Sequence, residues 1–136
     1  MPRPIRATID LGALKHNLAV ARQHADQGVA GPARLFAVIK ANAYGHGMLP
    51  VAQALAGLTD GFALLDLSEA AKLREAGIRE PILLLEGFFQ PEDLEAVAEL
   101  GIIPAVHRLE QLEAIEAAGL PVKLPVFIKF NTGMHR

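Results

Sequence analysis

The feature that most constrains the fold is a cycle of apolar run, helical segment and glycine that repeats along most of the chain. The apolar runs are short enough to be strands, and they cover residues 35–39, 61–65, 81–85, 102–106 and 122–130. Helical patterns between them each end at a glycine, over residues 46–56, 69–76, 91–100 and 109–118. Such a βα repeat predicts parallel strands joined by right-handed crossovers. Either an α/β barrel or an open doubly wound sheet satisfies this pattern.

A different pattern precedes the repeat. Residues 5–10 alternate apolar and polar side chains, which predicts a half-buried strand. Asp10 is placed to cap a helix over residues 11–25, whose leucines recur at helical spacing. We therefore divide the chain into an amino-terminal strand and helix, residues 1–33, and a βα unit, residues 34–136.

Composition and charge exclude several classes of protein. The 136 residues have a formal net charge of −2 and no basic cluster, so nucleic acid is not an expected partner. Cysteine is absent, which excludes disulfides and cysteine-based metal sites. His16 and His24 lie too far apart for a metal site, and none is predicted. No apolar run approaches a membrane span of about 20 residues, so we expect a soluble, cytoplasmic protein.

The most informative strand end belongs to the run 35–39, which is typical of a strand buried on both faces. Lys40 follows it directly, and the carboxyl ends of parallel strands are where α/β folds bind ligands. Low-dielectric surroundings favour the neutral amine, which is a nucleophile or base that condenses with carbonyl compounds. Tyr44 could point into the same opening. The residues alone leave a second interpretation open, in which Lys40 snorkels to solvent and Tyr44 packs at the rim.

Other polar residues follow the later strands. Asp66 and Ser68 are best explained as the loop and cap of a helix, with Ser68 as the cap. Glu86 ends a strand beside a glycine and could pair with a cation. His107 begins a helix, where imidazolium would oppose the helix dipole, so a neutral or solvated histidine is expected.

Two cations flank the end of the last apolar run. Lys129 and Arg136 would face the same opening as Lys40 if this run joins the sheet. Together they would favour a neutral amine at Lys40 and attract a carboxylate or phosphate. A surface ion pair at the strand end is the simpler alternative.

Two segments resemble a known family. Residues 37–47, AVIKANAYGHG, resemble the cofactor-lysine motif of alanine racemases, which are fold-type III pyridoxal-phosphate enzymes. Residues 129–136, KFNTGMHR, resemble the family motif Lys-x-(Asp/Asn)-(Thr/Ser)-Gly-Met-x-Arg. The resemblance covers essentially the whole chain and implies a TIM-type (β/α) barrel. A complete barrel takes roughly 250 residues, so this chain would hold about the first five βα units.

The resemblance also implies roles for individual residues. Lys40 would bind pyridoxal 5'-phosphate covalently and act as general acid and base on the D-face of the substrate. Tyr44 would hydrogen-bond the cofactor phosphate, and Arg136 would contact its phenolic oxygen. Lys129 would be carbamylated, with its negative charge orienting Arg136. The second base in the family is a tyrosine from the carboxyl-terminal β domain of the other subunit, whereas the one tyrosine here is Tyr44.

The implied function is interconversion of L-alanine and D-alanine by a homodimeric full-length enzyme, which supplies D-alanine for peptidoglycan. Because the second base is absent, we expect these residues alone to be inactive. Two other classes remain: a pyridoxal-phosphate-binding homeostasis protein without catalysis, and a non-enzymatic βα interaction module. Substrates other than alanine depend on residues outside this sequence.

Overall fold

The structure is a computed structural model that describes residues 3–27 and 31–135. Its elements, in chain order, are α1 (Leu11–Asp26), β1 (Phe36–Val38), α2 (Lys40–Tyr44), α3 (Met48–Leu55), β2 (Gly61–Leu64), α4 (Leu67–Glu75), β3 (Ile82–Leu84), α5 (Asp93–Glu99), β4 (Ile102–Val106), α6 (Leu109–Ala117) and β5 (Phe127–Ile128). The strands pair in parallel in the order β1-β2-β3-β4-β5. The predicted α/β fold with parallel strands is confirmed. None of the helices within the described residues combines the length and apolar character needed to span a bilayer.

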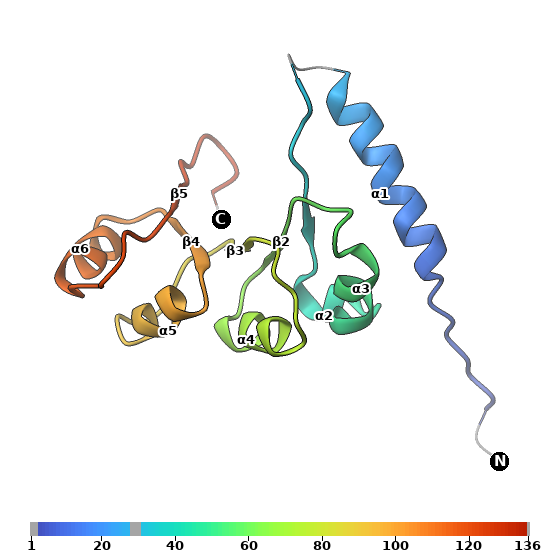
Figure 1. The fold of residues 1–136 in the computed structure, drawn as a ribbon, viewed down its shortest axis with the longest axis horizontal. Coiled ribbons are helices and arrows are strands. Elements are labelled where there is room, and N and C mark those ends of the chain that lie inside the picture. The colour runs from blue at the N-terminus through green and yellow to red at the C-terminus, as the bar shows by residue number, and fades with distance from the viewer. Residues whose placement is uncertain (1–2, 28–30, 136) are drawn as a thin grey trace.

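The sheet curls, which distinguishes it from an open doubly wound sheet. Figure 1 shows the strands along an arc, with α3 to α6 on its outer side and the carboxyl-terminal segment on its inner side. The rings of Phe36 on β1 and Phe127 on β5 meet edge to face, with centroids 6.1 Å apart, although these are the two edge strands. Gly61 is paired with Phe36, and a Cβ on Gly61 would lie 2.5 Å from that ring. The arrangement is that of part of a barrel.

The main core lies between the sheet and its outer helices. Strand residues Phe62, Ile82 and Ile102 are fully buried, as are Leu73 on α4 and Val97 on α5. Full burial of such a side chain contributes roughly 1.5–3 kcal/mol. Packing of α4 and α5 against β2, β3 and β4 thus holds these three strands in place.

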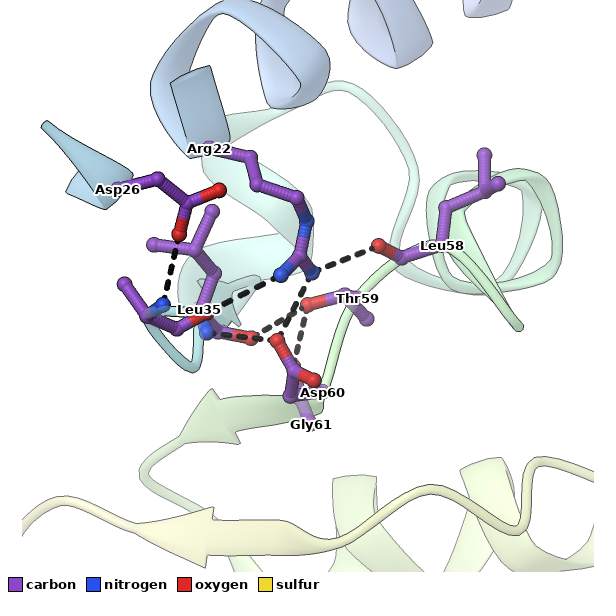
Figure 2. A network of polar contacts seen from close by, with 8 residues as sticks. Arg22, Asp26, Leu35, Leu58, Thr59, Asp60 and Gly61 are labelled. Atoms are coloured by element: carbon purple, nitrogen blue, oxygen red, sulfur yellow. Dashed lines mark hydrogen bonds and ion pairs between the residues drawn. The ribbon is translucent and has the colours of Figure 1, made fainter. Parts of the chain in front are cut away.

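The amino-terminal end of the sheet is fastened to α1 by a polar network (Figure 2). Arg22 on α1 donates to the Asp60 carboxylate at 2.8 Å and to the carbonyl oxygen of Leu58 at 3.1 Å. The N–H of Leu35, which leads into β1, also donates to Asp60 at 2.8 Å. The bond from Leu35 and the guanidinium of Arg22 hold the pKa of the Asp60 carboxyl below its ordinary value.

A second arginine fastens the neighbouring units at the same end. Arg74 on α4 donates to four carbonyl oxygens at 2.8–3.2 Å, those of Ile78, Glu80, Leu100 and Gly101. Partial burial lowers the pKa of its guanidinium. The Leu100 and Gly101 carbonyls follow α5, where backbone acceptors lack helical partners. Arg74 therefore joins α4 to the end of the next βα unit.

Several sequence predictions need correction at the edges. The strand expected over residues 5–10 is wrong: this segment is extended, exposed and unpaired with any described strand. Alternation predicts a strand only where an edge is available for pairing. β5 is limited to Phe127–Ile128 instead of 122–130, because only these residues pair with β4. β1 is not buried on both faces, because Phe36 and Ala37 are only partly buried and Val38 is 41% exposed.

Candidate active site

A cleft of about 930 Å³ opens on the inner side of the sheet, at the carboxyl ends of the strands. Its polar lining includes Lys40, Glu86, His107, Arg108 and Lys129. Its apolar lining includes Leu65, Leu83, Leu85, Ala105, Phe127 and Phe130. The structure therefore brings together four of the residues singled out at separate strand ends: Lys40, Glu86, His107 and Lys129.

Lys40 is placed by the last ladder bond of β1. The N–H of Ile39 donates to the carbonyl oxygen of Ala63 on β2 at 2.9 Å, and the Ile39 side chain is buried. Lys40 follows immediately and is half-buried at the cleft wall. The prediction that this lysine leaves the core at a strand end is confirmed.

The segment after Lys40 differs from any expectation drawn from the sequence. Ala41, Asn42, Ala43 and Tyr44 all have φ between 51° and 54°, so α2 is a left-handed turn. Gly45 and Gly47 continue at positive φ, as glycines readily do. Non-glycine residues seldom adopt this conformation, and only Asn42 is of a type that favours it. The asparagine and the glycines were the available signals, and they do not by themselves predict four such residues in succession.

The cleft is richer in cations than in anions. Lys40, Arg108 and Lys129 line it beside His107, whereas Glu86 is the carboxylate among its lining residues. A concave site with this balance attracts phosphate or carboxylate groups. The backbone N–H of Lys129 donates to the carbonyl oxygen of Val106 at 2.9 Å, which ties the last segment to β4.

A buried glutamine that the sequence analysis missed holds the Glu86 loop. Gln111 on α6 is 3% exposed, and its Oε1 accepts from the N–H of His107 at 3.0 Å. Its amide group donates to the carbonyl oxygens of Glu86 and Phe88 at 3.4 Å. His107 is exposed, and its Nε2 lies 3.2 Å from the Glu86 carbonyl oxygen. The position of Gln111 one turn after His107 was the only sequence signal.

Two other predicted residues are not part of the cleft lining, and a third lies outside the described residues. Asp66 is the cap of α4, correcting the assignment to Ser68: its carboxylate accepts from the Ser68 N–H at 2.7 Å. Hydrogen bonds from Ser68 hold the pKa of this carboxyl below its ordinary value. Tyr44 is 60% exposed and lies outside the lining residues. Arg136 lies outside the described residues.

The chemistry of the cleft suits an organic cofactor better than a metal. In residues 3–27 and 31–135, no group of three histidine or acidic side chains could hold a metal ion. The cleft does offer an amine at Lys40, cations at Arg108 and Lys129, and apolar walls from Leu65, which follows β2, and Leu83 on β3. An aldehyde cofactor with a flat ring and a phosphate fits this donor set.

The fold and the cleft together define a class of protein. A curled parallel βα sheet, outer helices and a lysine-bearing cleft at the carboxyl ends of the strands are the arrangement of barrel enzymes.

Comparison with known proteins narrows the class to a family. The family profile described as "Alanine racemase, N-terminal domain" matches residues 9–136. Alanine racemase of Erwinia tasmaniensis is 52% identical over the whole chain, and the catabolic alanine racemase of Pseudomonas aeruginosa is 52% identical over 98% of it. The chain belongs to the alanine racemase family.

The fold is also shared with solved structures. The crystal structure of the biosynthetic alanine racemase from Pseudomonas aeruginosa matches 99% of the chain with a TM-score of 0.90 and 44% identity. The enzyme from Corynebacterium glutamicum matches 95% with a TM-score of 0.80 and 37% identity. The chain spans about 36% of the length of these relatives, so the comparison concerns their amino-terminal part.

Proposed function

We propose that this chain supplies the cofactor lysine of a pyridoxal-phosphate-dependent alanine racemase. The observation that carries the proposal is the position of Lys40, which leaves β1 into a cation-lined cleft within the family's barrel. Support also comes from relatives at about 50% identity that are named alanine racemase. The substrate proposed is alanine.

The proposed roles follow the chemistry of each side chain. Bound covalently to Lys40, pyridoxal phosphate would supply an electron sink that acidifies the Cα–H of the substrate. Lys40 would donate and accept a proton at its Nζ on one face of that carbon. Leu65, which follows β2, and Leu83 on β3 would shield the Nζ atom of Lys40 from water. Arg108, which lines the cleft, would attract anionic groups. The exposed Tyr44 hydroxyl would turn from solvent to donate a hydrogen bond to the cofactor phosphate, and Arg136 would contact the phenolic oxygen.

Lys129 has a proposed role that depends on modification. It lines the cleft with Lys40, and it is exposed to solvent, through which dissolved carbon dioxide would reach it. Reaction of its neutral amine with carbon dioxide would form a carbamate and release a proton. The resulting negative charge would accept hydrogen bonds from Arg136 and orient the guanidinium.

Racemisation needs proton transfer on both faces of the substrate carbon. Tyr44 is the only tyrosine of the chain, and it is assigned to phosphate binding. The second base would therefore come from another part of the enzyme, in a cytoplasmic homodimer that provides D-alanine for peptidoglycan. Residues 1–136 alone are then expected not to racemise alanine.

The test measures where pyridoxal phosphate attaches. The 136-residue chain is incubated with the cofactor, reduced with borohydride, and the modified lysines are located by mass spectrometry. We expect Lys40 to dominate over the exposed Lys15 and Lys72, and Lys40→Ala to remove the dominant adduct. Equal modification of all three lysines contradicts the proposal. Interconversion of alanine enantiomers by this chain alone would show that no further base is required.

A further inference from the structure

The left-handed turn after Lys40 is the most strained segment of the described chain. Four successive residues, Ala41 to Tyr44, have positive φ, and none is glycine. For L-residues this conformation costs roughly 1–2 kcal/mol each. Such strain persists only where the surrounding structure fixes it, and it concentrates at functional sites.

One side-chain bond connects this turn to the core. The Oδ1 atom of Asn42 accepts a hydrogen bond from the N–H of Met48 at 2.8 Å, and Met48 is the buried first residue of α3. Gly47, at the cap position of α3, has no side chain to accept this bond. Asn42 therefore caps a helix that begins six residues later. The backbone carbonyl oxygen of Asn42 also accepts a hydrogen bond from the N–H of Gly47 at 2.9 Å.

Further contacts hold the turn at its other end. The N–H of Ala43 donates to the carbonyl oxygen of Ile39 at 2.9 Å, and both side chains are buried. The Nδ1 atom of His46 donates to the carbonyl oxygen of Ala43 at 2.8 Å. Lys40 thus lies between a buried strand end and a turn that is bonded to a buried helix. Its backbone has little freedom to reorient.

We propose that Asn42 is a positioning residue that acts through α2 on Lys40. Its bond to α3 keeps the turn left-handed, and the turn sets the direction in which Lys40 leaves β1. Asparagine suits the position because it tolerates positive φ and also carries an acceptor. The role of Lys40 in binding the cofactor rests on the proposed function, whereas the restraint of the Lys40 backbone by Asn42 does not.

Three variants separate the acceptor from the backbone preference. Asn42→Asp keeps an acceptor, and its charge is favourable at the amino end of α3. Asn42→Gly removes the acceptor while relieving the strain at this position. Asn42→Ala removes the acceptor and keeps the strain. Asn17→Ala, on the exposed surface of α1, is the matched control.

Three measurements are made on the 136-residue chain. Borohydride trapping with pyridoxal phosphate gives the ratio of Lys40 to Lys15 modification. Hydrogen exchange gives the protection of the Ala43 and Met48 amides, with Phe62 on β2 as reference. Urea unfolding gives the stability of each variant.

We expect Asn42→Gly and Asn42→Ala to lower the Lys40 ratio about tenfold, because an amine that is no longer held in a fixed direction loses part of its advantage of orientation. Both should also lose protection at Ala43 and Met48 but not at Phe62. Asn42→Asp and Asn17→Ala should keep the Lys40 ratio and the amide protection of the parent. Because glycine relieves strain, Asn42→Gly should unfold at a higher urea concentration than Asn42→Ala while sharing its low ratio.

Two outcomes overturn the proposal. One is an unchanged Lys40 ratio or unchanged Ala43 protection in Asn42→Gly. The other is a ratio that simply follows the urea midpoint across all variants, which would indicate a structural role only. If the parent chain shows no preference for Lys40, the proposed function fails instead. Exchange at Ala43 then still decides whether Asn42 restrains the residues beside Lys40.

Discussion

The two ends of the same strands are built for different purposes. At the amino-terminal end, Arg22 and Arg74 donate hydrogen bonds to carbonyl groups from several βα units. Asp60 accepts hydrogen bonds from Arg22 and from the N–H of Leu35. At the carboxyl end, Lys40 and Lys129 line an open cleft. Within residues 3–27 and 31–135, the one ion pair is that of Arg22 with Asp60. Contacts that stabilise the fold thus gather at the amino-terminal ends of the strands, whereas charged side chains that line a cleft gather at the carboxyl ends, as in barrel enzymes.

The largest expected effect tests this contrast with two arginines. Arg74→Ala should lower the free energy of unfolding by about 2 kcal/mol, because partly buried carbonyl groups lose their donor. Arg108→Ala, at the cleft, should change it by less than about 0.5 kcal/mol. Urea unfolding followed by circular dichroism measures both. Equal losses would mean that the two ends do not differ in this way.

A smaller effect is expected from a residue at the carboxyl ends of the strands that stabilises the fold and does not line the cleft. Asp66→Ala should lower the free energy of unfolding by about 1 kcal/mol, because α4 loses its cap. Trapping of pyridoxal phosphate at Lys40 should be unchanged, since Asp66 does not line the cleft. Asp66→Asn retains an acceptor and serves as the control. A loss of Lys40 trapping in Asp66→Ala would assign this loop to the site.

The smallest effect concerns pH at the amino-terminal end. The pKa of Asp60 is lowered in the folded state, so its contribution is present above the unfolded value of about 3.9 and is lost as pH falls through the folded value. Asp60→Asn does not titrate in this range. The difference in urea midpoint between the parent and Asp60→Asn should therefore shrink from pH 7 to pH 3. A difference that stays constant over this range would show that the carboxylate charge contributes nothing.

The interior of the repeat could be predicted from the sequence because local and tertiary signals agree there. β4 has the predicted bounds, and α6 ends within a residue of prediction, because buried strands and glycine stops coincide. The placement of Lys40 and Lys129 in one cleft followed from parallel pairing alone. Alternation failed over residues 5–10, since a strand depends on a partner that local sequence does not specify.

The parts of the site that escaped prediction depend on contacts between distant atoms. In the left-handed turn, Asn42 accepts a hydrogen bond from Met48 and Ala43 is buried, and neither feature is visible in residue type. Gln111 acts because its amide meets the carbonyl groups of a loop from another βα unit. A polar residue on a helix is ordinarily expected to face solvent.

The contact between Phe36 and Phe127 has a consequence for the curvature of the sheet. Both rings lie toward the amino-terminal ends of their strands, and Phe127 forms part of the cleft lining. Their contact bridges the two edge strands across the inner side of the curled sheet, with Gly61 leaving the space that the Phe36 ring occupies. A side chain at position 61 would therefore push the Phe36 ring away from Phe127 and weaken an aromatic contact that draws the two edges of the sheet together.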